Sequence, residues 1–157
     1  MNNSDPKNMI LKSKWTLWVH STRDRNWNID SYQDIYEFET VDDVLKIAIN
    51  FKHLGIKHQH FFIMRSGIKP IWEDINNREG CTCSFRTEIE YVGHNDSIPM
   101  IELWEYLMYS ILGETLLDDN SIINGLSLTP KNNWAIIKIW NKNNNDLTEI
   151  LKKKIRT

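Results

Sequence analysis

Residues 67–74 read GIKPIWED and hold the two most informative side chains of the chain, Trp72 and Glu73. The segment follows an apolar run, and its Gly and Pro are typical of a turn. Another tryptophan, Trp27, also lies in a polar stretch, RNWN at residues 25–28. Tryptophan usually anchors a core because its large apolar surface is costly to expose. Two tryptophans in polar loops, one beside a carboxylate, therefore indicate a site for a flat ligand with two aromatic faces, a donor edge and a positive charge.

Length and composition predict a single domain. The chain has 157 residues, enough for one hydrophobic core, and its formal net charge of -2 argues against a general polyanion-binding protein. We expect residues 1–8 to be a disordered tail and residues 9–157 to form one domain. No stretch approaches the roughly 20 apolar residues of a membrane span, and the polar start lacks a signal-peptide core. Cys81 and Cys83 are poorly placed to bridge each other, which predicts reduced thiols and a cytoplasmic location.

The pattern of apolar residues predicts an α+β fold. Strands rich in aromatic and β-branched residues are expected at residues 15–20, 35–40, 60–65, 81–90, 122–128 and 134–140. Helices are expected from Thr40 to Gly55, from Pro99 to Gly113 and at residues 146–156, with turns at 91–97 and 129–133. Strands interrupted by a few helices, without strict alternation, favour a curved, mainly antiparallel sheet. About three helices should then pack on its convex face.

The remaining tryptophans have different environments. Trp15, Trp18 and Trp104 lie on apolar strand or helix faces, so we expect them in the core. A core position is also compatible with Trp140. For Trp27 and Trp72, the ordinary alternative to ligand stacking is a position as a lid over the core.

Several segments form an ordered pattern over most of residues 12–140. They are WTLW at 15–18, RNW at 25–27, FETVDD at 38–43, GIKPIWED at 67–74, Trp104 through LGE at 112–114, and NG at 124–125 followed by Trp140. Each is weak alone, whereas the segment around Trp72 in register with the others is specific. In this order the chain resembles the eukaryotic translation initiation factor 4E family, the mRNA cap-binding proteins.

The resemblance implies a cap-binding slot on the concave side of the sheet. In the family, two tryptophans sandwich the 7-methylguanine ring, and the matching positions are Trp27 and Trp72. Methylation at N7 gives the base a positive charge, so each stacked ring adds a cation–π contribution of roughly 0.5–2 kcal/mol. The acid that accepts the guanine N1 and N2 protons matches Glu73. Trp140 matches a family tryptophan near the methyl group and the phosphates.

The match at the triphosphate site is less complete. The family's arginine on the last hairpin falls on Lys131, whereas its next phosphate-binding lysine falls on Ile136. Lys138 lies two residues farther on the same predicted strand face and is expected to substitute for that lysine. A third basic position of the family has no match, and we expect Arg78 or Arg86 to reach the phosphates instead. Ordinary solvated surface charge remains the alternative for these residues.

The resemblance also implies a partner-binding face on the helices, where this chain departs from the family. Leu45 replaces the dorsal tryptophan that receives a helical motif of the scaffold factor 4G or of the 4E-binding proteins. On the second helix, Glu105 and Tyr106 replace a leucine and an acid. The apolar surface that we expect to remain consists of Val41, Leu45, Met108 and Tyr109. The expected partners are therefore capped mRNA and a scaffold protein of the factor 4G type with a non-standard motif.

No other chemistry is indicated by the sequence. Cys81 and Cys83 with His94 give too few ligands for a closed zinc site, and no nucleophile or phosphate-loop motif occurs. We expect no metal, cofactor or enzyme activity, and a monomer. The predicted function is recruitment of capped mRNA for translation initiation. The composition, rich in Asn, Ile and Lys, and the altered helix face favour a divergent viral or parasite member of the family. Two alternatives stay open: a decoy that keeps the fold and sequesters host factors, and a repressor that holds capped RNA.

Overall fold

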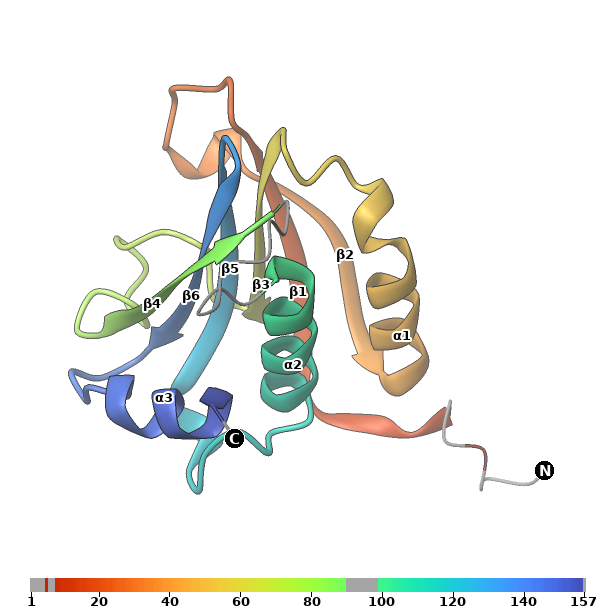
Figure 1. Ribbon diagram of the computed structural model, residues 1–157, viewed down its shortest axis with the longest axis vertical. Helices are drawn as coiled ribbons and strands as arrows, with labels where there is room; N and C mark the ends of the chain where they lie inside the picture. Colours follow the sequence, from red (N-terminus) through yellow and green to blue (C-terminus); the bar gives the residue numbers. More distant parts are fainter. Residues whose placement is uncertain (1–4, 6–7, 90–98, 157) are drawn as a thin grey trace.

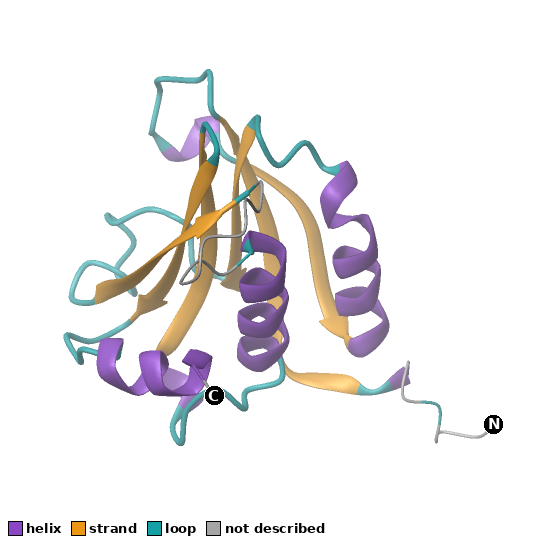
Figure 2. Cartoon of the chain, in the orientation of Figure 1, coloured by secondary structure: helices purple, strands orange, loops and turns teal. Residues whose placement is uncertain are grey.

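A computed structural model describes residue 5 and residues 8–89 and 99–156 of the chain. It consists of a curved sheet with helices packed against it (Figure 1, Figure 2). The strands are β1 Ile10–Ser21, β2 Gln33–Thr40, β3 Gln59–Arg65, β4 Cys81–Glu88, β5 Ile123–Lys131 and β6 Trp134–Asn141. The helices are α1 Val41–Asn50, α2 Met100–Leu112 and α3 Thr148–Arg156, with short 3-10 helices η2 Ile29–Ser31, η3 Phe51–His53 and η4 Asn120–Ile122.

The six strands form one sheet in the order β2-β1-β3-β5-β6-β4, and every neighbouring pair is antiparallel. All three helices contribute side chains to one core cluster with the strands, which places them on the same face of the sheet. The predicted α+β fold with an antiparallel sheet and three helices is therefore confirmed. Within the described part of the chain, no helix is both long and apolar enough to cross a membrane.

The core lies between the sheet and the helices. Trp15 of β1 and Trp104 of α2 are both fully buried there, as predicted, and Phe51 stacks on Trp104 with ring centroids 5.1 Å apart. Leu147, just before α3, and Leu151 of α3 belong to the same cluster. Full burial of a large apolar side chain contributes roughly 1.5–3 kcal/mol, so this layer holds the helices against the sheet.

Strand β1 separates two apolar environments because successive side chains point to opposite faces of a sheet. Trp15 and Leu17 point into the helix-side core, whereas Trp18 packs against a separate cluster of Phe62, Met64 and Trp140. Trp18, predicted to lie in the core with Trp15 and Trp104, is therefore only partly buried and belongs to this second cluster instead. An odd spacing from Trp15 puts it on the concave face.

Several element boundaries differ from the predictions. Strand β1 begins at Ile10 rather than at residue 15, because its alternating polar residues remain exposed on the pleated surface. The connection predicted at residues 129–133 is shorter, since Lys131 still pairs with Trp134 and only residues 132–133 form the loop. Helix α3 begins at Thr148 rather than at residue 146. The backbone N–H of Thr148 donates a hydrogen bond to the Asp146 carboxylate at 2.9 Å. The turn expected at 91–97 and most of the tail expected at 1–8 lie outside the described residues.

The start of α1 and the end of α2 each depend on particular local residues. The Thr40 hydroxyl accepts a hydrogen bond from the Asp43 backbone N–H at 3.1 Å and caps α1, as predicted. At the end of α2, Gly113 keeps a right-handed conformation, and the left-handed position falls on the next residue, Glu114, with φ 53°. Left-handed conformation is unfavourable for a residue with a Cβ, so something outside the turn holds Glu114 in place.

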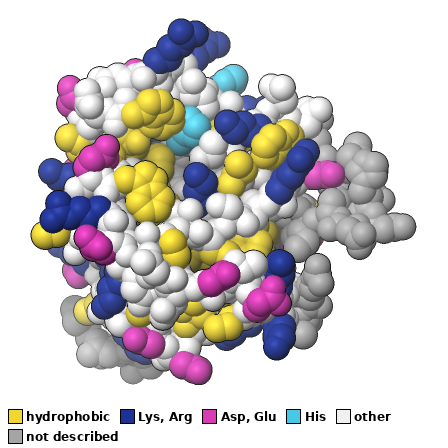
Figure 3. All heavy atoms as spheres, turned by 90° about the vertical axis from the view of Figure 1, so that its left-hand side faces the viewer, with side chains coloured by type: hydrophobic (Ala, Val, Ile, Leu, Met, Phe, Trp, Pro, Cys, Tyr) yellow, Lys and Arg dark blue, Asp and Glu magenta, His cyan; other side chains and the backbone are white. Residues whose placement is uncertain are grey.

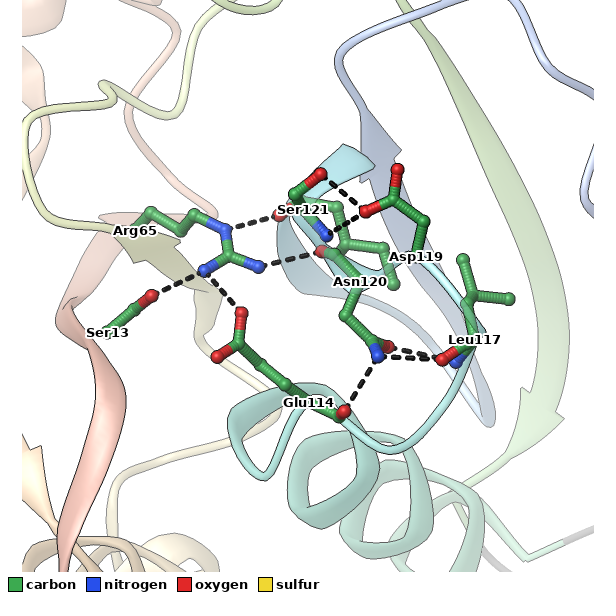
Figure 4. A network of polar contacts seen from close by, with 8 residues as sticks. Ser13, Arg65, Glu114, Leu117, Asp119, Asn120 and Ser121 are labelled. Carbon is green, nitrogen blue, oxygen red and sulfur yellow. Dashed lines mark hydrogen bonds and ion pairs between the residues drawn. The ribbon is translucent and has the colours of Figure 1, made fainter.

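Arg65 at the end of β3 supplies that constraint (Figure 4). Its guanidinium binds the Glu114 carboxylate at 2.9 Å and donates to the carbonyl oxygens of Ile123 at 2.6 Å and Asn120 at 2.8 Å. It also donates to the Ser13 hydroxyl at 2.7 Å. Both partners of the ion pair are largely buried, with 16% and 12% of their side chains exposed. Arg65 therefore ties β1, β3, the α2 terminus and the start of β5 together.

Candidate cap-binding site

The concave face of the sheet carries a slot of about 270 Å³. The face shown in Figure 3 exposes several apolar side chains close to His side chains, with basic and acidic side chains spread around them. The slot is lined by residues from the loop after β1, from β3, from the loop after β3, and from β5 and β6: Trp27, Tyr32, His60, Phe62, Pro70, Ile71, Trp72, Glu73, Ser127, Thr129, Lys138 and Trp140. The structure thus brings together Trp27, Trp72, Glu73, Trp140 and Lys138, which the sequence singled out from distant segments.

The loop that carries Trp72 and Glu73 is held by buried amides. Asn77 is 1% exposed, and its side-chain amide donates to the carbonyl oxygens of Lys69 and Ile71, both at 2.9 Å. Its side-chain oxygen accepts from Asn124 of β5 at 3.0 Å, which connects the loop to the sheet. Buried amides with partners on both sides give the loop a defined shape. The ring of Trp72 therefore projects from a rigid support.

The Asp74 carboxylate closes the same loop. It accepts hydrogen bonds from the backbone N–H groups of Lys69 and Asn76, both at 2.8 Å. Burial raises the pKa of the Asp74 carboxyl, but these hydrogen bonds more than offset burial and hold the pKa below its usual value. The ionised form thus stabilises the turn that presents the neighbouring acid, Glu73.

Trp72 and Trp140 are in direct contact. Trp72 is 45% exposed and stacks on Trp140 with centroids 4.9 Å apart and an interplanar angle of 26°. Trp140 is almost fully buried, and its Nε1–H donates to the Ser127 hydroxyl at 3.0 Å. Trp140 belongs to the concave apolar cluster and also lines the slot, so its position is compatible with both interpretations that the sequence left open.

Trp27 is supported by a histidine that the sequence did not single out. Trp27 is 52% exposed and stacks nearly parallel on His20, with centroids 4.2 Å apart and an angle of 9°. His20 is 1% exposed, and its Nε2 lies 2.7 Å from the carbonyl oxygen of Asn26, so that nitrogen carries the proton. The alternation of β1 was the available signal, since His20 follows Trp18 by two residues on the same face.

Two further titratable groups line the slot in neutral form. Burial, and then the charge of Glu73, raise the pKa of the Tyr32 phenol to about 12. Burial, followed by the charges of His20, Lys131 and Lys138, lowers the pKa of His60 to about 4. Both side chains are therefore uncharged near neutral pH. The charges among the slot-lining residues are those of Glu73 and Lys138.

The predicted phosphate-binding residues occupy different places. Lys138 lines the slot, whereas Lys131 lines a neighbouring hollow at the end of β5. Arg78 is exposed on the loop after Trp72 and lines neither of these two spaces. The guanidinium of Arg86 instead lies over the Trp134 ring, with Cζ 4.2 Å from its centroid. Only Lys138 of the expected cations is thus part of the slot itself.

The cysteines form no disulfide, and no group of three or more His, Cys, Asp or Glu side chains among the described residues could hold a metal ion. Cys83 is buried in the core, where burial raises the pKa of its thiol. Cys81 is half-buried and directs its thiol toward the carbonyl oxygen of Asn143 at 3.4 Å. These contacts are those of structural thiols.

The helix side of the molecule carries a small apolar hollow of about 130 Å³ between α1 and α2. Its lining residues are Leu11, Val41, Val44, Leu45, Tyr109, Leu112 and Gly113. Three residues expected on the partner face, Val41, Leu45 and Tyr109, are therefore together. Met108 is 0% exposed in the core, so its predicted place on this surface was wrong. Helical phase explains the difference, because Met108 lies one turn after the buried Trp104 and points the same way.

The sequence profile described as Eukaryotic initiation factor 4E matches residues 10–157. The chain belongs to this family. Factor 4E-2 of Schizosaccharomyces pombe is 28% identical over 141 residues, which cover 87% of this chain and 55% of that protein. Factor 4E of Saccharomyces cerevisiae is 29% identical over 138 residues, covering 84% of this chain and 61% of the yeast protein. The chain thus spans little more than half the length of these members of the 4E family.

Solved structures of the 4E family have the same fold. Ascaris suum eIF4E-3, solved as a complex with m7G cap, superimposes with a TM-score of 0.76 at 21% identity, covering 94% of this chain and 84% of that one. Caenorhabditis elegans eIF4E-3, solved with the 4E-binding protein Mextli and cap analog, gives a TM-score of 0.71 at 21% identity, covering 94% and 81%. At these identities the similarity establishes the shared fold.

Proposed function

We propose that this chain binds the 7-methylguanosine cap of mRNA and recruits the capped RNA for translation initiation in the cytoplasm, as a binding protein without catalytic activity. The observation that carries the proposal is the presence of Trp27, Trp72 and Glu73 in one slot. Each tryptophan is about half exposed and is supported by an internal ring, His20 or Trp140. Two supported aromatic rings and one carboxylate are the groups that a flat, cationic base with donor edges requires.

The roles of the slot residues follow from this chemistry. Trp27 and Trp72 stack on the two faces of the methylated base, and Glu73 accepts the protons of its N1 and N2 groups. Trp140, beneath Trp72, lies beside the methyl group, and Lys138 binds the first phosphates as a charge-assisted donor. Lys131 extends the phosphate contacts toward the hairpin end. Arg78 reaches the phosphates only if its loop side chain turns inward.

A fluorescence titration tests the proposal directly. Stacking of a base on Trp27 and Trp72 should quench tryptophan emission, so 7-methylguanosine triphosphate is expected to quench saturably and GTP to quench much less. Equal quenching by the two nucleotides would contradict cap recognition. Retention of the chain on immobilised cap, together with capture of a scaffold protein and the ribosomal subunit, is the result expected of an initiation factor. Retention of capped RNA alone would indicate a repressor, and no retention on cap would indicate a decoy.

Glu73→Gln is expected to lower the affinity for 7-methylguanosine triphosphate and to reduce discrimination against GTP and an adenine analogue. The amide keeps the shape of the side chain, but it offers a donor to the donor edge of guanine and removes the charge that attracts the methylated ring. Hydrogen bonds to a charged group contribute about 1.5–3 kcal/mol, which corresponds to a loss of roughly tenfold or more. Glu79→Gln, on the same loop but outside the slot, is the matched control and should leave the titration unchanged. Equal affinity and selectivity in Glu73→Gln would remove this carboxylate from the proposed site.

We further propose that the hollow between α1 and α2 binds a dedicated scaffold protein rather than the ordinary factor 4G motif. Leu45, 38% exposed, stands where the family has a tryptophan, and hot-spot tryptophans commonly contribute 2 kcal/mol or more to binding. A consensus peptide of the Tyr-x-x-x-x-Leu-apolar type is therefore expected to bind weakly or not at all by calorimetry. Leu45→Trp should strengthen this interaction, whereas Ile150→Trp on α3 should not. Tight binding of the consensus peptide to the unmodified chain would show that the surface binds the ordinary motif without the tryptophan.

A further inference from the structure

A second hollow, of about 520 Å³, lies at the end of the strands that form the slot. It is lined by Thr22, Lys57, Pro130, Lys131, Asn132 and Trp134. Along β5, Thr129 lines the slot and Lys131 lines this hollow, a step of two residues or about 7 Å. Along β6, the step from Lys138 to Trp134 is four residues, or about 13 Å. These even steps keep the side chains on one face, so the hollow continues the slot toward the hairpin end.

The ring of Trp134 is held in position by a side chain of the neighbouring strand β4. The guanidinium of Arg86 lies over its ring at 4.2 Å. Arg86 belongs to β4, which pairs with β6 on the side opposite β5. The hollow opens toward β5 and the loops before β3, so Arg86 stabilises the ring without occupying this space. A tryptophan fixed on one side by a cation is a stacking platform of the kind used for nucleic-acid bases.

Lysines from two segments surround this platform. Lys131 comes from the end of β5, and Lys57 comes from the loop before β3. That loop is tied to the end of β1, because the Thr22 N–H and hydroxyl both donate to the carbonyl oxygen of His58 at 3.0 Å. The residue opposite Trp134 in the antiparallel pairing of β4 and β6 is an acid, Glu88, which approaches from the side of β4. With a chain net charge of -2, this local collection of cations is not a consequence of a generally basic surface.

We propose that this hollow binds the ribonucleotide chain that follows the capped end of the RNA, with phosphates at Lys57 and Lys131 and a base stacked on Trp134. The inference rests on the proposed function, since the cap in the slot sets the start of the RNA. Cations interleaved with an aromatic ring suit a polyanion with flat bases. An acidic protein segment would use the lysines but would have no use for the ring. The direction of the RNA is then from Lys138, across Lys131, to Trp134.

The test compares the affinity for 7-methylguanosine triphosphate with that for a capped, unstructured five-nucleotide RNA. The unmodified chain is expected to bind the capped RNA about five- to tenfold tighter, in line with one additional stacked base. Trp134→Ala should abolish this gain, and Lys57→Gln should reduce it and lower the salt dependence by about one phosphate contact. Neither change should alter the affinity for the free nucleotide by more than about twofold, because both residues lie outside the slot. Lys152→Gln, on α3, is the matched charge control and should keep the full gain.

The outcomes separate this inference from the proposed function. If the nucleotide binds but the capped RNA binds no tighter, or if the gain survives both changes, the hollow is not the path of the RNA. Lys57→Gln keeps the test valid should Trp134→Ala unfold the hairpin. If the nucleotide itself does not bind, cap recognition fails first. Uncapped RNA then decides the hollow: binding that depends on Trp134 and Lys57 supports it as an RNA site, and absence of such binding overturns it.

Discussion

Replacing Trp27 or Trp72 by alanine is expected to lower the affinity for 7-methylguanosine triphosphate at least tenfold. Removal of one stacked aromatic ring costs about 1–3 kcal/mol, and the positive charge of the methylated base adds to that value. Both rings are about half exposed, so thermal stability should change little. Fluorescence titration of each variant gives the affinity, and the quench at saturation should also become smaller. If both variants bind normally, the sandwich is wrong.

Two controls separate stacking from a general loss of aromatic surface. Trp72→Phe keeps a smaller stacking ring and should give an intermediate affinity. Tyr106→Ala removes a ring of similar exposure, 42%, from the helix side of the molecule and should bind as tightly as the unmodified chain. An equal loss of affinity in Trp72→Ala, Trp72→Phe and Tyr106→Ala would point to destabilisation, which a melting curve would reveal. The expected ranking is therefore a specific signature of the sandwich.

The sequence predicted those parts of the fold that local chemistry determines. The Thr40 cap, the apolar stripe of α2 and the aromatic and β-branched residues of β1 are all local signals, and each of these elements is found in the structure. The environment of Trp18 was predicted incorrectly, because an aromatic residue of a strand can pack on either side of a curved sheet. Period-two alternation indicates that Trp15 and Trp18 face opposite ways. It does not indicate that the concave face has an apolar cluster of its own.

The candidate site was predictable where the sequence pattern was specific. Trp27 comes from one loop and the neighbours Trp72 and Glu73 from another, and all three line one slot. The resemblance to the family had already predicted that they act together. The supporting residues were not predictable in the same way. His20 stacks on Trp27 only because the loop after β1 folds back over that strand. Lys131 lies two residues past Thr129, the last residue of β5 that lines the slot, and so lines the neighbouring hollow. Such positions depend on loop geometry, which has no periodic signal.

Arg65→Met is expected to destabilise the chain by about 3–5 kcal/mol in urea unfolding, the usual cost of leaving one partner of a buried ion pair alone. The Glu114 carboxylate would keep its largely buried position without a cation, and the carbonyl oxygens of Ile123 and Asn120 would lose their donors. The exposed pair of Lys14 and Glu37 is the matched control. Lys14→Met should leave the unfolding midpoint almost unchanged because exposed pairs contribute little. Equal effects of the two substitutions would show that the Arg65 network carries no special stability.

Glu114→Gly tests whether the ion pair is the reason for the left-handed backbone at residue 114. Glycine adopts a φ of 53° without a steric penalty, so on backbone grounds alone it should stabilise the turn by about 1 kcal/mol. In the unmodified chain we expect the opposite, a net loss, because the substitution leaves the Arg65 guanidinium largely buried and without its carboxylate. In the Arg65→Met background the sign should reverse, since glycine then removes both the backbone strain and the unpaired carboxylate. Stabilisation by Glu114→Gly in both backgrounds would mean that the residue is merely strained; a change of sign would show that the strain is kept to hold the ion pair.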